Sequence, residues 1–279
     1  MHADQLAGIG DEAAAALPEQ IAAIADLGWP GIELRAVDGL ALADLDSSRF
    51  LRVRRALRAT GLRVVCLDSR IGNRSRPITA PPTADMRELD VLAERCASLG
   101  TRYIRIMSYL SDGLDEPEWQ ARVLDRIALL GDRAARHGVV LLHENCTGWA
   151  GSDPERMLRL VDAGGPCLRL LFDVGNGVDH GYDAVDVLQR ILPHVEHVHV
   201  KDAVGSPGHA EYVLPGDGTA RVHECLRMLL DHGYNGAFSL EPHLLARPHE
   251  GLTATDPAPF LRAGRRLEEL LQTASTGVA

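Results

Sequence analysis

The sequence predicts an α/β protein with the (β/α)8 TIM barrel fold, in a single domain spanning residues 1–279. Two observations support this prediction. Strand-like and helix-like segments alternate eight times along the chain, which is typical of a parallel eight-stranded barrel. The last four strands also end in acidic, histidine or lysine residues, and the active site of such a barrel lies at these strand ends. An open doubly wound sheet is the alternative, but Gly8-Ile9-Gly10 is too short a match to its glycine-rich turn.

Short runs of apolar residues mark the strands. The first run is weak, whereas later ones such as VVLLHE and LRLLFD are apolar until a polar end. The predicted strands are residues 5–9, 31–35, 63–68, 103–107, 139–144, 168–173, 196–201 and 237–241.

Apolar residues at helical spacing, followed by a stop residue, mark the helices. Ile21, Ile24 and Leu27 form one such face, which Gly28 ends. Asp153 and Pro154 are typical of the cap and first turn of a helix. The predicted helices are residues 18–27, 48–60, 84–99, 117–137, 154–161, 183–192, 220–232 and 258–274.

The amino-acid composition argues against some classes of binding partner. The net charge of −10 argues against nucleic acid, because neutralising phosphates requires clustered basic residues, and also against an anionic membrane surface. No apolar run is long enough to span a bilayer, and the N-terminus has no signal-peptide pattern. Five scattered cysteines suit a reducing, cytoplasmic location. We expect a small-molecule ligand. The chain could be a monomer or a homo-oligomer.

The stretch His197-Val198-His199-Val200-Lys201-Asp202 stands out. In a strand, His197, His199 and Lys201 share one face. Polar residues on that face make sense if the strand opens onto a site. Lys201 is also the single lysine of the chain, which favours a functional role, although chance is the alternative. His197 lies one step deeper and is expected to support the site or the core.

Four strand ends carry groups that could bind a metal. Along the sequence, each of these strand-end residues lies roughly one βα unit, about 30 residues, after the one before it. We therefore expect all of them at the same mouth of the barrel. Carboxylates brought together there would repel unless a cation lay among them. Oxygen-rich ligands with one nitrogen favour Mn²⁺ or Mg²⁺, with Co²⁺ and Zn²⁺ as further choices. The four strand-end groups are Glu144, Asp173, either His199 or Lys201, and Glu241, and four unrelated loop residues are the alternative.

These motifs resemble those of the sugar phosphate isomerase/epimerase family, within the xylose isomerase-like TIM barrel superfamily. The resemblance rests on HVHVKD at 197–202, LHEN at 142–145, FDVGN at 172–176 and SLEP at 239–242, together with GIELR at 31–35 and PGDG at 215–218. It implies a divalent metal held by Glu144, Asp173, His199 and Glu241, and among the ions that this donor set favours we expect Mn²⁺ first. It also implies that Glu144 and Glu241 act as catalytic acid and base.

The expected activity is isomerisation or epimerisation of a sugar, sugar phosphate or related polyhydroxy carbonyl compound, by proton transfer through an enediolate. A lyase of the same superfamily, either inosose dehydratase-like or cleaving oxidised C-glycosides, is the alternative. A sugar-binding barrel without catalysis is the third. Ketose 3-epimerases of the family have a histidine and an arginine where this chain has Asn176 and Gly205.

Other polar residues near the strand ends are candidates for substrate contact. Lys201 is expected to hold an oxyanion or a carboxylate. Glu33 is expected to bind a substrate hydroxyl or to support the site from behind, and Trp149 to stack on a sugar or to be an ordinary loop residue. His143 points to the face opposite Glu144 and is expected to be structural. The full set of substrate-contact candidates is Lys201, Glu33, Asn176, His243, His180 and Trp149.

Overall fold

The computed structural model describes residues 3–245, 247 and 251–276, and they form a parallel eight-stranded barrel surrounded by helices. The sheet order is β1-β12-β9-β8-β7-β6-β5-β2, and a parallel bridge between Ile9 and Glu33 joins the two ends of this order. The predicted (β/α)8 fold is therefore confirmed. The barrel strands are β1 (Leu6–Gly8), β2 (Gly31–Leu34), β5 (Arg63–Asp68), β6 (Tyr103–Ser108), β7 (Val140–Gly148), β8 (Leu168–Asp173), β9 (Val195–Val200) and β12 (Ala237–Leu240).

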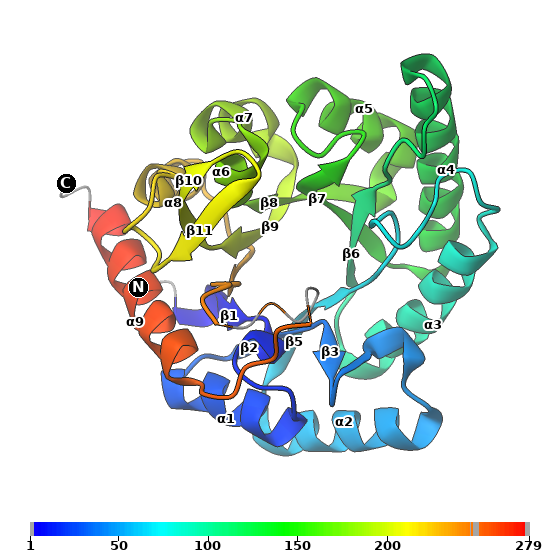
Figure 1. Cartoon of the computed structure of the whole chain (residues 1–279). Coiled ribbons are helices and arrows are strands. Elements are labelled where there is room, and N and C mark those ends of the chain that lie inside the picture. The colour runs from blue at the N-terminus through cyan, green and yellow to red at the C-terminus, as the bar shows by residue number, and fades with distance from the viewer. Residues whose placement is uncertain (1–2, 246, 248–250, 277–279) are drawn as a thin grey trace.

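Helices between the strands form the outer ring seen down the barrel axis in Figure 1. Each begins and ends within three residues of its predicted bounds, because an aspartate cap or a terminal glycine marks an end of most of them. Asp153, for example, accepts hydrogen bonds from the backbone N–H groups of Glu155 and Arg156. The helices are α1 (Leu17–Leu27), α2 (Ser47–Thr60), α3 (Thr83–Leu99), α4 (Glu116–His137), α5 (Pro154–Gly164), α7 (Ala184–Ile191), α8 (Val222–Asp231) and α9 (Ala258–Thr276).

The apolar core has two parts. The larger cluster includes buried residues of both strands and helices, among them Leu89, Ile104 and Leu130. A small cluster that includes Ala7, Val65, Leu142 and Leu171 comes from four different strands. Two residues beyond Leu142 and Leu171, on the same strand faces, stand Glu144 and Asp173, so these faces change from apolar to polar toward the carboxyl ends of the strands.

Several short elements that the sequence pattern did not predict lie around this polar end. They are the hairpin of β10 (Asp202–Ser206) and β11 (His209–Val213), the hairpin of β3 (Ala36–Val37) and β4 (Leu40–Ala41), and the short helix α6 (Asn176–His180). The β10–β11 hairpin packs on α6, in front of the barrel in Figure 1. Strand β9 ends at Val200, one residue before the predicted end at Lys201.

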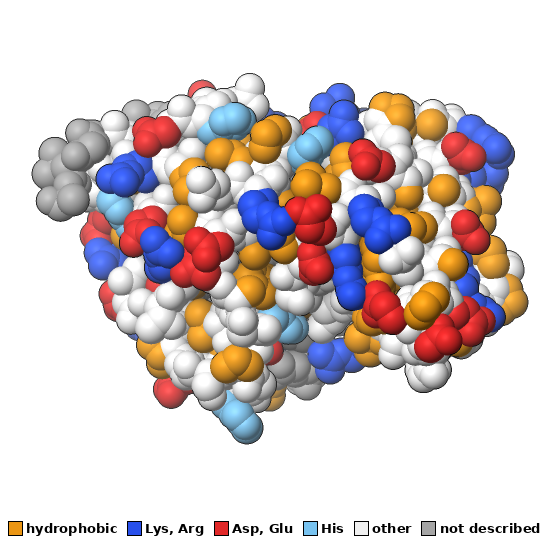
Figure 2. All heavy atoms as spheres, turned by 90° about the horizontal axis from the view of Figure 1, so that it is seen from above, with side chains coloured by type: hydrophobic (Ala, Val, Ile, Leu, Met, Phe, Trp, Pro, Cys, Tyr) orange, Lys and Arg blue, Asp and Glu red, His pale blue; other side chains and the backbone are white. Residues whose placement is uncertain are grey.

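Acidic and basic side chains are interspersed on the face shown in Figure 2, with apolar side chains between them. Within the described ranges, the helices all lack the length and apolar character that crossing a membrane requires.

Candidate metal centre and substrate cavity

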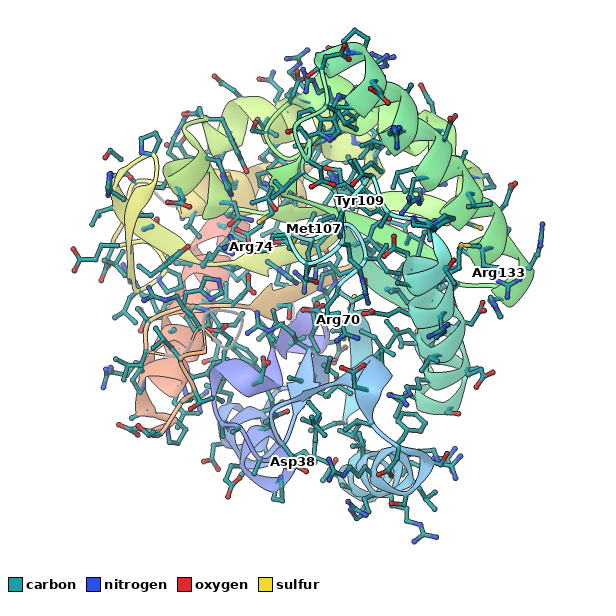
Figure 3. The ribbon with its side chains drawn as sticks, turned by 45° about the vertical axis from the view of Figure 1, so that its right-hand side comes forward. Asp38, Arg70, Arg74, Met107, Tyr109 and Arg133 are labelled. Atoms are coloured by element: carbon teal, nitrogen blue, oxygen red, sulfur yellow. The ribbon has the colours of Figure 1, made fainter. Side chains whose placement is uncertain are left out.

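A cavity of about 580 Å³ opens at the carboxyl ends of the strands. Its volume lies within the range of small-molecule sites, roughly 300–1,000 Å³. Figure 3 places Arg70, Arg74 and Met107, three residues of its wall, over the middle of the barrel, whereas Arg133 lies on the outer face of α4. The polar lining includes Asp11, Arg35, Asp68, Arg105, Glu144, Asn176, His180, Lys201, Tyr212, Glu241 and His243.

The four predicted metal-binding groups meet at the floor of this cavity. One ligand atom from each of Glu144, Asp173, His199 and Glu241 lies within 4.8 Å of the others, and all four residues are buried. Parallel pairing explains the convergence, because the register sets Asp173 of β8 beside His199 of β9, and His199 beside Ser239 of β12. Glu241 follows β12 directly, with its backbone N–H bonded to the carbonyl of Val200.

The orientation of the His199 ring is set from below. Its Nε2 atom lies 3.0 Å from Oε1 of Glu33, whose other oxygen lies 2.8 Å from Nε2 of His197. The free Nδ1 atom therefore faces the cluster, 3.5 Å from Oε2 of Glu241 and 3.9 Å from Oδ2 of Asp173. This buried atom makes no hydrogen bond to any of the described residues. A histidine whose second nitrogen bonds a carboxylate is the usual arrangement of a metal ligand.

Glu144 is paired with an arginine on the neighbouring strand. Nη1 of Arg105 lies 2.8 Å from Oε2 of Glu144, and the amide of Asn176 donates to Oε1 over 3.1 Å. Burial raises the pKa of Glu144, but the guanidinium of Arg105 outweighs burial and keeps the pKa below its ordinary value. The carboxylate is therefore ionised at neutral pH.

Glu241 is held by two cations. Arg35 donates to Oε1 over 2.7 Å, and the ammonium group of Lys201 donates to Oε2 over 2.7 Å. Burial raises the pKa of Glu241, yet Lys201 and the nearby histidines hold the pKa well below its ordinary value. Arg35 also contacts Asp11 and Glu12, so it ties this strand end to the segment after β1.

Asp173 is fixed on both sides. Its Oδ1 atom accepts hydrogen bonds from the backbone N–H groups of Gly175 and Asn176, while Oδ2 accepts one from Lys201. Burial raises the pKa of Asp173 to about 6, although the Lys201 ammonium acts in the opposite direction. Each of the three clustered carboxylates thus has a partner cation within the chain, and repulsion among them does not by itself require a metal.

The donor set still fits a divalent cation. Three carboxylates supply hard oxygen ligands and Nδ1 of His199 supplies one nitrogen, which suits Mn²⁺, Mg²⁺, Co²⁺ or Zn²⁺. The unbonded, inward-facing Nδ1 atom is the observation that favours such an ion. Buried polar atoms normally have a partner, and a cation would provide one here.

Not all candidates for substrate contact reach the cavity. Lys201, Asn176, His180 and His243 are among its lining residues. Glu33 is fully buried beneath His199, as the supporting alternative expected, and does not belong to the described lining. Trp149 is also outside that lining: its indole N–H donates to Glu116 and its ring packs against Arg156, so the expected stacking on a sugar has no geometric support.

His243 occupies a constrained position beside the cluster. Its backbone φ is +52°, in the left-handed region that non-glycine residues rarely adopt. Glu12 holds it there by accepting from its backbone N–H and by lying 3.0 Å from Nδ1. Its ring meets the ring of Tyr212 edge to face at 4.9 Å, which brings the β10–β11 hairpin to the cavity wall.

Sequence reasoning missed several cavity residues, chief among them Asp68 and Arg105. Asp68 ends β5 as Asp173 ends β8, so the strand-end rule applied to the first half of the chain would have identified it. Asp68 lies 3.0 Å from Arg105, and neither of its oxygens has a hydrogen bond within the described chain. Burial raises the pKa of Asp68 well above its ordinary value, outweighing Arg105.

Comparisons with known proteins agree with this architecture. An inosose dehydratase of Bacillus licheniformis is 28% identical over 142 residues, which is 45% of this chain and 47% of that protein, so the chain spans about half the length of such curated relatives. A D-tagatose 3-epimerase-like protein matches with a TM-score of 0.76 at 15% identity, over 99% of this chain and 100% of that one. The IolI protein, solved with a zinc atom, matches with the same TM-score and identity over 97% and 99%.

These structural likenesses, at low identity, show the fold alone. The decisive match is to the family model for the xylose isomerase-like TIM barrel, which covers residues 21–263. The chain belongs to the xylose isomerase-like TIM barrel family.

Proposed function

We propose that the protein is a divalent-metal-dependent isomerase or epimerase of a sugar, sugar phosphate or related polyhydroxy carbonyl compound. The observation that carries this proposal is the pair Glu144 and Glu241. Both carboxylates line one cavity, both lie in one potential metal cluster, and arginine or lysine partners keep the pKa of each below its ordinary value. An ionised carboxylate beside a bound carbonyl compound can act as a base.

The ligands would be Glu144, Asp173, His199 and Glu241, with Mn²⁺ as the first choice and Mg²⁺, Co²⁺ or Zn²⁺ as alternatives. A divalent cation held there would stabilise negative charge as it develops on the carbonyl oxygen and its neighbouring hydroxyl. Zinc in the IolI structure supports the choice of a divalent metal.

The remaining chemistry belongs to the side chains. Glu241 or Glu144 removes a proton from the carbon next to the carbonyl. The other carboxylate takes a proton from water and delivers it to the opposite face of the enediolate, and the first carboxylate releases its proton to solvent, so protons balance over the cycle. Arg35 and Arg105 keep the two carboxylates in place. Asn176, His180 and His243 offer hydrogen-bonding groups on the cavity wall, as recognition of several hydroxyls requires.

A lyase that removes water from the same kind of intermediate is the second candidate. Two observations favour it. The curated relatives with detectable sequence similarity include inosose dehydratases. Asp68 also lines the cavity, and burial raises its pKa well above the ordinary value, which favours the protonated form that donation to a departing hydroxyl requires.

Hydrogen exchange in deuterated water separates these functions. The Mn²⁺-loaded protein is incubated with ketoses, ketose phosphates and keto-inositols, and the products are followed by mass and NMR. An isomerase or epimerase replaces a carbon-bound hydrogen by deuterium and leaves the mass of the compound otherwise unchanged. Glu241→Gln abolishes this exchange. Glu269→Gln, on the exposed face of α9, is the matched control.

Other outcomes contradict the proposal in different ways. A product lighter by one water establishes the lyase. An absence of exchange across the panel, in protein shown to hold metal, points to a sugar-binding barrel without catalysis.

A further inference from the structure

Lys201 is the single lysine of the sequence, and the structure buries it almost completely. Only 2% of its surface is exposed. A long charged side chain is rarely buried so far unless it is paired. Here the ammonium group donates to Oδ2 of Asp173 and, over 2.7 Å, to Oε2 of Glu241.

These two oxygens also belong to the candidate metal cluster. Both face Nδ1 of His199, at 3.9 and 3.5 Å, and their residues supply two of the three carboxylates in the cluster. The ammonium therefore binds two of the carboxylates that a divalent cation would bind. Glu144, the fourth member, is paired with Arg105 instead.

The position of Lys201 depends on a neighbouring glycine. A Cβ atom added to Gly175 would lie 2.4 Å from Cγ of Lys201, closer than real Cβ contacts occur. The lysine stem thus runs against bare backbone in the turn that follows Asp173. Any larger residue at 175 would displace the lysine side chain, so Gly175 provides the space in which this side chain packs.

An ammonium and a divalent cation cannot share the same two oxygens at close range without strong repulsion, since buried like charges are poorly screened. We propose that Lys201 is the resident cation of the metal-free site, and that a divalent metal binds by exchange with its ammonium group. The ammonium leaves Asp173 and Glu241 as the metal arrives and moves into the adjoining cavity, which Lys201 already lines. This inference rests on the metal site of the proposed function.

If the metal replaces the Lys201 ammonium, Lys201 has opposite effects on the metal-free and the metal-bound protein. Without metal, the ammonium offsets two buried carboxylates and supports the fold. With metal, it competes for ligands and weakens binding. Replacing lysine by an uncharged residue of similar length should therefore destabilise the metal-free protein and strengthen metal binding.

Lys201→Met tests this directly. Protein purified with Mn²⁺ and then treated with a chelator is titrated calorimetrically with Mn²⁺, and its melting temperature is measured with and without the ion. We expect binding at least tenfold tighter than in the wild type, a lower melting temperature without metal, and a larger rise on loading. Arg95→Met removes another buried cation far from the cluster and should leave Mn²⁺ affinity unchanged.

A second measurement does not require the Met variant to fold. Because the chain has one lysine, protein labelled with ¹⁵N-lysine gives a single side-chain signal. Its ammonium protons should exchange slowly with water in the metal-free protein and much faster after saturation with Mg²⁺ or Zn²⁺, which are diamagnetic. Lys201→Gln, titrated beside Lys201→Met, provides a second neutral variant.

Two results overturn the inference. Wild-type metal affinity in both neutral variants, or weaker affinity, would show that Lys201 does not compete with the ion; so would slow ammonium exchange in the saturated protein. These outcomes leave the metal assignment standing. If neither the wild type nor the variants bind any of the ions, the metal site of the proposed function is refuted. The replacement of the Lys201 ammonium by a metal is then refuted as well.

Discussion

His199 and Glu33 form a buried pair, with Nε2 of the histidine 3.0 Å from Oε1 of the carboxylate and neither side chain exposed. The pair joins strands far apart in the sequence and fixes which ring nitrogen faces the metal cluster. Burial would lower the pKa of His199, but Glu33 and Glu241 hold the pKa well above its ordinary value. The carboxylate below the ring thus controls both orientation and basicity.

Glu33→Gln should weaken Mn²⁺ binding by roughly 10- to 100-fold, the usual effect of removing a partner behind a histidine ligand. The amide can still bond the ring but no longer raises its basicity. Calorimetric titration measures the change. Glu196→Gln, the same substitution at the opposite end of the barrel, where the carboxylate bonds Tyr103, should bind Mn²⁺ as the wild type does. Equal affinity in the two variants would show that Glu33 has no part in the site.

Asp173→Asn and Glu144→Gln should lose most bound metal while the barrel stays folded. Each change replaces an anionic ligand by a neutral amide of the same shape, which hard divalent cations bind poorly. Chelated protein is reloaded with Mn²⁺, and elemental analysis should find about one ion per chain in the wild type and far less in the variants. Asp231→Asn, on the exposed end of α8, is the control. Full occupancy in either ligand variant would contradict the assignment.

Much of this fold could be predicted from the sequence because its signals are local. Apolar runs give the barrel strands, and capping residues and glycines give the helix ends, so most bounds agree within two residues. The grouping of Glu144, Asp173, His199 and Glu241 followed from one rule, that parallel strands end at a common mouth.

The partners of these groups could not be predicted in the same way. Arg105 reaches Glu144 and Arg35 reaches Glu241 across strands that the sequence separates by 39 and 206 residues. The pairing of Lys201 with Asp173 depends on where β9 ends and on the bare backbone at Gly175. The strands of the β10–β11 hairpin have only five residues each, and although β11 (HAEYV) begins with polar–apolar alternation, β10 (DAVGS) does not. These features depend on tertiary packing, which no local pattern records.

Asp202, the last residue of the HVHVKD stretch, organises the loop above the site. Its buried carboxylate accepts hydrogen bonds from four backbone N–H groups, those of Ala203, Gly216, Gly218 and Ala220. Gly218 is required for this approach, because a Cβ atom there would lie 2.2 Å from Oδ1 of Asp202. The PGDG turn thus serves as a cradle for a carboxylate of the chain itself.

Asp202→Ala should therefore cost about 3 kcal/mol of unfolding free energy, because it leaves buried N–H groups without their charged acceptor. Urea unfolding of the metal-free protein measures the loss. Asp183→Ala, which removes the cap of α7 at a more exposed place, should cost only about 1 kcal/mol. Similar losses of unfolding free energy in both variants would mean that Asp202 stabilises its turn no more than an ordinary helix cap does.

His143 gives the fold a specific sensitivity to acid. The ring is fully buried, and neither nitrogen has a hydrogen-bond partner among the described residues. Burial lowers the pKa of His143 from 6.5 to about 4. Between these values the unfolded chain binds a proton at this residue and the folded chain does not, so unfolding free energy falls as pH decreases from 6.5 toward 4. The penalty is small above pH 7, reaches about 3 kcal/mol at pH 4 and is complete only below that pH.

His143→Leu keeps an apolar side chain of similar size and removes the titrating group. The difference in unfolding free energy between variant and wild type should therefore shift in favour of the variant by about 2–3 kcal/mol as pH falls from 7.5 to 4.5. Urea unfolding at a series of pH values measures it, and taking the difference cancels the other groups that titrate in this range. His232→Leu, at the exposed end of α8, is the matched control and should show no such trend. A pH-independent difference for His143→Leu would mean that the buried ring can be protonated in the folded protein as readily as in the unfolded chain.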